Sequence, residues 1–445
     1  MDLKVLAVSF SSEDRNGRWS YFRFTTTRIF FLTDKKHKSF FGATVSQQGG
    51  KMRQYSSVFK DESRLDINYV PPSLPHRTFQ LDLLNQFFRS LIESPGKMAQ
   101  RVLITGRIGT GKTVLSQRFG LRITRDAREK GINLQYVHTN CRECKGSLFL
   151  ILQRVISKFH PHFPKRGYSA EEILQMLIQI LDDQDLYLIL TLDELDALIR
   201  NGGSEPLYNL TRIQEDRPDA PRRLSLICIL REIEHADSLD PSTRSTLQHN
   251  TIHLAEYSRS QLLDILSDRV SLAFRVGVVS RDILSLIAGL ASFEGGDARY
   301  GIELLWRAGK YADVSRLVEV SAECVRRAAA SVYPTVHKDV VSALQVHEKL
   351  FLLGVARRFK QTGAVQMSMG EAEESYAIVC EEYEKRRLGH TQVWKYVKDL
   401  SAVGIIESRL SGVGQRGKTT MISLSKVPAS DLERELVKVL SVGGK

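Results

Sequence analysis

Residues 101–130 read RVLITGRIGTGKTVLSQRFGLRITRDAREK, and this stretch decides the fold class that we expect. The apolar run at 102–105 is typical of a buried strand, and a longer stretch of helical character starts at 113. Between them, residues 106–113 match G-x-x-x-x-G-K-T, the loop pattern that holds the phosphates of a nucleotide. Strand, loop and helix follow in the order that the pattern requires, so we predict a nucleotide site at the end of a strand.

The glycines of this loop permit a tight curl in which backbone N–H groups and a helix N-terminus face the phosphates. Lys112 is expected to reach the β and γ phosphates, and Thr113 to supply a hydroxyl ligand for Mg²⁺. The alternative is a glycine-rich turn with no ligand. The predicted loop contacts are Gly106, Arg107, Ile108, Gly109, Thr110, Gly111, Lys112, Thr113 and Val114.

A second apolar run, LYLILTLDELD at 186–196, carries Asp193 and Glu194 at its end. Open α/β sheets bind their ligands at the carboxyl ends of the strands, so these carboxylates are expected beside the loop. Asp193 would belong to the magnesium site, and Glu194 would orient and deprotonate the attacking water. By itself, such a pair at a strand end would also suit the start of a helix.

Further apolar runs at 133–140 and 223–230 alternate with helical stretches, as a parallel α/β sheet with crossover helices requires. After Leu254 only helix-period segments follow, until SVYPTV at 331–336 interrupts them. The expected domains are an extension at 1–55, an αβα ATPase domain at 56–254, an all-helical lid at 255–332 and a third domain at 333–445.

Residues 1–55 show no clear periodicity. They are interpreted as a translated extension, with Met52 as an alternative start, or else as a small β-rich appendage or a basic DNA-contacting arm.

The bulk composition favours a polyanionic partner. The 445 residues carry a formal net charge of +12, which suits nucleic acid first and an anionic membrane surface second.

No apolar run reaches the roughly 18 to 20 residues that a membrane span needs, so we expect a cytoplasmic protein. The five cysteines are scattered, and Cys141 and Cys144 form one CxxC without a second pair, which favours a strand-end loop over a metal site.

VFKDESRLDINYVPPSLPHRTFQ at 58–80 resembles the lead-in to the ATPase core of the archaeal replication initiators, relatives of origin recognition complex subunits and of their cell-division-cycle loader. The resemblance runs from about Val58 to the C-terminus and implies an AAA+ ATPase. It places a strap around the adenine; the alternative is a strap that only covers the sheet. The implied adenine contacts are Tyr69, Val70, Pro71, His76 and Arg77.

GGDARYGIELLWRAGKYAD at 295–313 resembles the second sensor of the same family, which implies that Arg299 of the lid points to the γ-phosphate. A lid guanidinium that senses this charge would couple nucleotide state to domain angle. The alternative is an exposed arginine at a helix start, paired with Asp297.

Two positions depart from the family pattern. Where the family usually has a polar asparagine sensor, this chain has Arg231, and the following family arginine falls on Ser242, with Arg244 two residues away. At these positions the chain therefore lacks the asparagine that would position water and the arginine that would act on the nucleotide of a neighbouring subunit. We expect tight nucleotide binding with slow turnover, so that the nucleotide acts as a switch or structural ligand.

Residues 388–425 contain apolar positions at helical spacing and then two β-type runs around a glycine-rich turn, the order of a winged helix. The predicted DNA contacts are Thr391, Gln392, Lys395 and Lys398 on the helix and Gln415, Arg416 and Lys418 at the hairpin tip. The family resemblance adds an insertion after Asn140, where Lys165 and Arg166 are the basic candidates.

The sequence thus predicts an ATP-dependent replication initiator that binds ATP or ADP with Mg²⁺. The resemblance implies double-stranded origin DNA, the replicative helicase and other initiator subunits as partners. A regulatory switch ATPase, whose winged helix contacts a protein without specific DNA recognition, is the alternative. A remodelling ATPase with fast, assembly-dependent hydrolysis fits least, because Arg231 and Ser242 replace the residues that such chemistry uses.

Overall fold

The computed structural model describes residues 57–164, 166–215, 217, 219–232, 234, 237–332, 338–410, 419–424 and 427–442. The extension at 1–55 lies outside these residues, as do Lys165 and the hairpin-tip candidates Gln415, Arg416 and Lys418. No helix in the described part of the chain is long and apolar enough to span a membrane.

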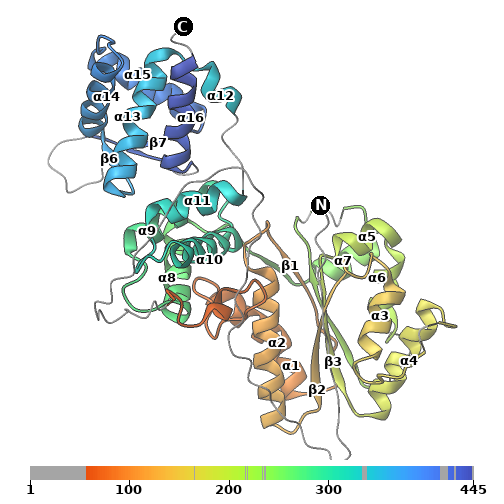
Figure 1. Ribbon diagram of the computed structural model, residues 1–445. Helices are drawn as coiled ribbons and strands as arrows, with labels where there is room; N and C mark the ends of the chain where they lie inside the picture. The colour runs from red at the N-terminus through yellow and green to blue at the C-terminus, as the bar shows by residue number, and fades with distance from the viewer. Residues whose placement is uncertain are drawn as a thin grey trace, which may run out of the picture. The chain divides into compact units, whose positions relative to one another are not determined.

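A parallel sheet forms the centre of the ATPase domain, as predicted (Figure 1). Its strands lie in the order β2-β3-β4-β1-β5, and every neighbouring pair is parallel. The strands are β1 (Arg101–Thr105), β2 (Leu134–Asn140), β3 (Tyr187–Asp193), β4 (Leu224–Ile229) and β5 (Thr251–His253). Because β4 lies between β3 and β1, the segment after β4 emerges between the two motifs that the sequence singled out.

Helices cover both faces of this sheet (Figure 1). On one face Phe88 and Phe119, with ring centroids 4.9 Å apart, pack against Ile104 and Ile189. The other face buries Leu103 and Leu190, so side chains that alternate along a strand enter different cores. The helices are α1 (Thr78–Glu93), α2 (Lys112–Glu129), α3 (Leu148–Ile156), α4 (Ala170–Asp183), α5 (Asp196–Gly202), α6 (Glu205–Arg212) and α7 (Pro241–Gln248).

Four helices with a separate core form the lid: α8 (Arg259–Ala273), α9 (Arg281–Phe293), α10 (Ala298–Val314) and α11 (Ala322–Val332). The segment at 57–69, which we call the strap, contains the short 3₁₀ helix η1 (Glu62–Leu65) and packs into this lid core. Phe59 pairs with Phe274, with ring centroids 4.8 Å apart. The strap therefore links the start of the ATPase domain to a lid that follows about 200 residues later.

The C-terminal part has its own hydrophobic core and a three-stranded antiparallel sheet in the order β6-β8-β7. Val393, Val397 and Leu400 are buried on α15, and β7 and β8 follow, so the predicted winged-helix order is confirmed. The elements are α12 (Lys338–Ala343), α13 (Val346–Thr362), β6 (Met367–Ser368), α14 (Met369–Glu382), α15 (His390–Ala402), β7 (Glu407–Leu410), β8 (Thr420–Ser423) and α16 (Ala429–Val442).

The strap approaches the lid closely only because position 309 of α10 is glycine. A Cβ built there would lie 2.4 Å from Phe59 Cζ and 2.9 Å from Phe274 Cε1.

We predict that Gly309→Ala lowers the stability of the lid by about 1–3 kcal/mol, because both rings must shift. Thermal and urea unfolding followed by circular dichroism measure this. The matched control is Gly370→Ala on α14, where an added Cβ meets nothing within 4 Å, so stability stays or rises. Equal behaviour of the two variants would contradict the predicted clash.

Candidate nucleotide-binding site

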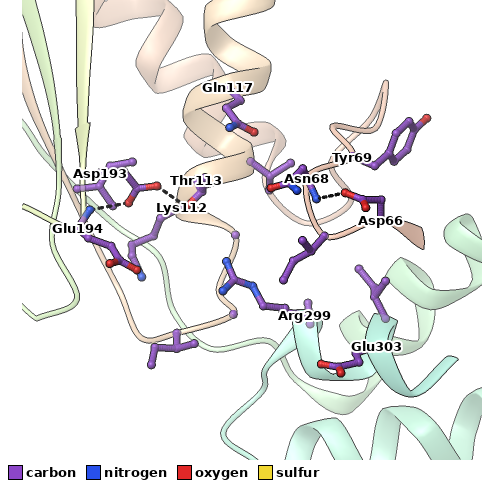
Figure 2. Close-up of a pocket in the computed structure, with 18 of the residues that line it drawn as sticks. Asp66, Asn68, Tyr69, Lys112, Thr113, Gln117, Asp193, Glu194, Arg299 and Glu303 are labelled. Atoms are coloured by element: carbon purple, nitrogen blue, oxygen red, sulfur yellow. Dashed lines mark hydrogen bonds between the residues drawn. The ribbon is translucent and has the colours of Figure 1, made fainter. Parts of the chain in front are cut away.

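One cavity of about 920 Å³ is lined by the phosphate-binding loop, the end of β3, the strap and the lid helix α10. Figure 2 shows Lys112, Thr113, Asp193 and Glu194 gathered at one end of it, and the strap residue Tyr69 at the other. The size suits a nucleotide, which needs a polar end for its phosphates and a more apolar end for its base. Segments far apart in the sequence thus build one site.

At the phosphate end, Thr113 Oγ1 donates a hydrogen bond to Asp193 Oδ2 at 2.7 Å, and His138 Nε2 lies 3.3 Å from the same oxygen. Burial favours a raised pKa for Asp193, but the hydrogen bonds from His138 and Thr113 outweigh burial and hold that pKa below its usual value. A hydroxyl and an ionised carboxylate side by side form the hard oxygen donor set that Mg²⁺ prefers. The residues present therefore fit a magnesium ion.

Lys112 donates from Nζ to the backbone carbonyls of Gly106 and, at 2.8 Å, of Arg107. Burial lowers the pKa of its ammonium group; Asp193 opposes this shift, whereas the cations Arg231 and Arg299 add to it. All three cations line the cavity. An anion of high charge, such as a terminal phosphate, would relieve their mutual repulsion.

The lid reaches this loop directly. Ala298, at the start of α10, donates its N–H to the carbonyl of Gly109 at 3.2 Å. Gly109 has φ 77°, and a Cβ there would lie 1.9 Å from Asp297 Oδ1, so only glycine fits between loop and lid. Asp297 caps α10 by accepting a hydrogen bond from the N–H of Tyr300 at 3.1 Å. Arg299, the residue after Ala298, lines the cavity between its two ends (Figure 2).

The strap end of the cavity is held by arginines. Arg64 Nη1 donates to Tyr69 Oη at 2.9 Å, and the guanidinium groups of Arg64 and Arg269 lie 5.0 and 4.9 Å from the centroid of the Tyr69 ring. Arg269, which belongs to α8, also donates to the carbonyl of Arg64 at 3.0 Å. These contacts hold the strap against the lid.

The cavity does not include every residue assigned from the sequence. The assigned residues that line it are Tyr69, Ile108, Gly109, Gly111, Lys112, Thr113, Val114, Asp193, Glu194 and Arg299. Those that do not line it are Val70, Pro71, His76, Arg77, Gly106, Arg107 and Thr110. Roles in nucleotide contact for this second group stay predictions.

Several of these other residues have structural contacts instead. His76 Nε2 lies 2.9 Å from Asp264 Oδ2 of the lid. Arg77 is buried and donates to the carbonyls of Thr110, at 3.0 Å, and Ala255, at 2.6 Å. It therefore joins the phosphate loop to the chain that leads into the lid. Arg107 pairs with Glu256 at 2.7 Å.

Sequence reasoning missed Asp66, Asn68, Gln117 and Trp306, all of which line the cavity. Gln117 lies four residues after Thr113 on α2, so helical spacing alone indicated the shared face. Asp66 and Asn68 lie three residues and one residue before Tyr69. For Trp306 no local signal existed, because its position depends on how α10 packs; its Nε1 donates to Glu62 of the strap at 2.7 Å.

Of the two positions that depart from the family pattern, 231 and 242, only the first lines the cavity. Arg231 lines the cavity, and its Nη2 lies 3.8 Å from Glu194 Oε1. Ser242 does not line it; its Oγ accepts a hydrogen bond from Arg212 at 2.6 Å, and Arg244 pairs with Asp237 at 3.4 Å.

The candidate DNA surface lies on α15 and before it. Its side chains Thr391, Gln392, Lys395 and Lys398 are all exposed. Between them stands Trp394, whose side chain is 42% exposed and carries Lys398 Nζ 3.7 Å from its ring centroid. The exposed run 385–387, which reads KRR, precedes this helix. Arg166 of the insertion is also exposed and lies between α3 and α4.

Three parts of the chain match known protein families. Residues 97–235 match the family described as "AAA domain", 263–330 the "Cdc6 AAA+ ATPase-type lid domain", and 339–434 the "CDC6, C terminal winged helix domain". The chain is 34% identical to the ORC1-type DNA replication protein 2 of Sulfurisphaera tokodaii over 383 residues, 84% of this chain and 91% of that protein. It is 28% identical to the ORC1-type DNA replication protein of Pyrococcus abyssi, over 83% of this chain and 88% of that protein.

Two solved structures are similar along the same length. Cdc6p from Pyrobaculum aerophilum aligns with a TM-score of 0.76 and 31% identity, covering 87% of this chain and 100% of that chain. The Aeropyrum pernix ORC1 protein in complex with DNA aligns with a TM-score of 0.58 and 29% identity, covering 86% of this chain and 97% of that chain.

We predict that Lys112→Ala weakens ATP binding roughly 30- to 150-fold, because one charged contact to the phosphates is worth about 2–3 kcal/mol. Equilibrium dialysis with labelled ATP and Mg²⁺ measures the dissociation constant. The matched control is Lys130→Ala at the far end of α2, where the lysine is exposed and affinity stays at the wild-type value. A wild-type dissociation constant for Lys112→Ala would remove Lys112 from the site.

Proposed function

The chain belongs to the Cdc6/ORC1-type family of archaeal DNA replication initiators, and from this we propose that it is an ATP-dependent initiator that binds origin duplex DNA through its winged helix. The observation that carries the nucleotide part is the single cavity that the phosphate loop, the carboxylates of β3, the strap and α10 line together. A ligand in that cavity touches both the ATPase domain and the lid. ATP and ADP would therefore favour different angles between them.

In this proposal Lys112 contacts the β and γ phosphates, and Thr113 and Asp193 hold Mg²⁺, which neutralises phosphate charge when bound. Arg299 senses the γ-phosphate from the lid, and Glu194 acts on the attacking water. The support is that Lys112, Thr113, Asp193 and Glu194 line one end of the cavity and that Arg299 lies between this end and the strap. Turnover is proposed to be slow, because Arg231 and Ser242 stand where the family has other residues. The nucleotide then acts mainly as a conformational switch.

For DNA, the support is the exposed polar face of α15 together with the similarity to an initiator that was solved in complex with DNA. In a winged helix, a helix of this kind enters the major groove and its lysines reach phosphates or base edges. The hairpin tip and the insertion that holds Arg166 are proposed as further contacts. Trp394 adds an apolar surface at the centre of the face, suited to a thymine methyl group.

We also propose the wider role that initiators of this family share: recruitment of the replicative helicase, with other initiator subunits as further partners, in the cytoplasm. The proposed domain division is 56–254, 255–332 and 333–445, after the extension at 1–55. A regulatory switch ATPase without specific DNA recognition is the competing function.

The experiment that tests this function is fluorescence anisotropy on a duplex from the origin region of its own genome and on a scrambled duplex, each across a salt series. We expect the origin duplex to bind at least about tenfold more tightly at physiological salt, because base contacts remain when phosphate contacts are screened. If both duplexes bind alike and dissociate together as salt rises, specific recognition by this chain is lost and the regulatory switch is the better function.

The lysines of α15 allow a sharper prediction. Lys395→Ala with Lys398→Ala should reduce the magnitude of the slope of log K against log salt by about 2, because each lost phosphate contact removes roughly 0.9. Anisotropy titrations at four salt concentrations determine the slope. As a control, Lys438→Ala removes an exposed lysine of α16 and should leave the slope unchanged. A double variant with the wild-type slope would place the DNA on another surface.

A further inference from the structure

Arg231 occupies a position that the sheet topology fixes. It follows β4, which lies between β3 and β1, so its backbone emerges between the carboxylates of β3 and the phosphate loop. The carbonyl of Arg231 accepts a hydrogen bond from the N–H of Gly106 at 3.2 Å. This hydrogen bond fixes the backbone of Arg231 at the phosphate loop, so only the direction of its side chain can vary.

Glu194 is held equally firmly at its backbone. Its N–H donates to Asp193 Oδ1 at 2.8 Å, and the next N–H, of Leu195, donates to the carbonyl of Ile229 at 3.0 Å. Its φ is 49°, a left-handed conformation that a glutamate adopts only when its surroundings hold it there. The direction of the carboxylate consequently depends on side-chain torsions and on the charges beside it.

The Glu194 and Arg231 side chains stand where two cavities meet. Both line the nucleotide cavity, and both line a second cavity of about 340 Å³ that also includes Arg200 and Glu234. Arg231 Nη2 lies 3.8 Å from Glu194 Oε1, and the Arg231 side chain is 41% exposed, so it is not buried in a core. A cation at this place attracts the carboxylate toward the wall between the two cavities.

We propose that Arg231 is a positioning residue that restrains Glu194 and thereby slows hydrolysis of bound ATP; this rests on the proposed nucleotide function. In hydrolysis, the water oxygen bonds to the γ-phosphorus, the bond from that phosphorus to the bridging oxygen breaks, and the proton of the water passes to Glu194. The products are ADP and phosphate. The guanidinium offers five N–H donors to the carboxylate oxygens that must accept this proton. An uncharged asparagine would compete far less.

The opposite effect is also chemically reasonable, because an arginine beside a γ-phosphate can stabilise the charge of the transition state. The 3.8 Å distance between Arg231 Nη2 and Glu194 Oε1 favours restraint of Glu194. Removal of the Arg231 side chain should raise the hydrolysis rate if Arg231 restrains Glu194, and should lower it if Arg231 stabilises the transition state. Arg231→Ala removes the charge without adding an amide that could itself position water. Arg231→Lys keeps a charge on a long side chain.

The test is single-turnover hydrolysis of ATP at saturating Mg²⁺ by the full chain without DNA, with ATP affinity measured in parallel by equilibrium dialysis. We expect Arg231→Ala to hydrolyse about tenfold faster, a fraction of the ~10²–10⁴-fold that a positioned base supplies. ATP is kept saturating for each variant according to the affinity measured in parallel, so that only the rate of the bound state is compared, and Arg231→Lys should remain slow. Glu194→Gln should abolish the gain, so that the double variant is no faster than Glu194→Gln alone.

A rate for Arg231→Ala at or below wild type would overturn the restraint, as would a gain that persists with Glu194→Gln. Such results in a variant that still binds ATP would contradict only this inference and leave the proposed initiator function standing. Failure of the wild-type chain to bind ATP would instead remove the proposed nucleotide function, and the restraint with it. Thermal melting of each variant shows that a rate change is not caused by unfolding.

Discussion

The hydrogen bond from Thr113 to Asp193 joins the two segments on which the rest of the site depends. It brings together residues that are 80 positions apart and belong to different strand–helix units of the parallel sheet. Parallel strands end at one edge, so the hydroxyl and the carboxylate meet only if β1 and β3 are in the correct order and register. The oxygen pair suits Mg²⁺, and Lys112, Arg231 and Arg299, which line the same cavity, suit the phosphates that this ion would accompany.

The strap connects the nucleotide cavity to the lid. It precedes the ATPase core in sequence, yet Phe59 and Leu65 are buried in the lid core and Tyr69 lines the cavity. A nucleotide base bound at this end would therefore touch a segment that already belongs to the lid by packing. The contact between Gly109 and Ala298 adds a second junction, at the phosphate-binding loop. Two junctions at opposite ends of one ligand are what a switch between two domain angles requires.

Arg231 adds a positive charge to the wall of the nucleotide cavity. The sheet order would place any residue of that position beside the phosphate loop, so the position itself is inherited from the fold. The side chain places a positive charge, with Nη2 3.8 Å from Glu194 Oε1, at the position where the family resemblance implies an asparagine. If Arg231 restrains Glu194 as proposed, bound ATP would be hydrolysed slowly and the site would keep one nucleotide state for longer.

The sequence by itself determined the elements whose signals are local. The loop pattern after an apolar strand indicated the phosphate site, and the apolar spacing of α15 followed by two β-type runs indicated the winged helix. Only the tertiary structure decided which residues of the irregular segment before α1 face the cavity. Asp66 and Asn68 line it, whereas His76 pairs with the lid. The physical reason is that an irregular segment has no periodic pattern to orient its side chains, so their directions depend on packing against helices that follow some 200 residues later.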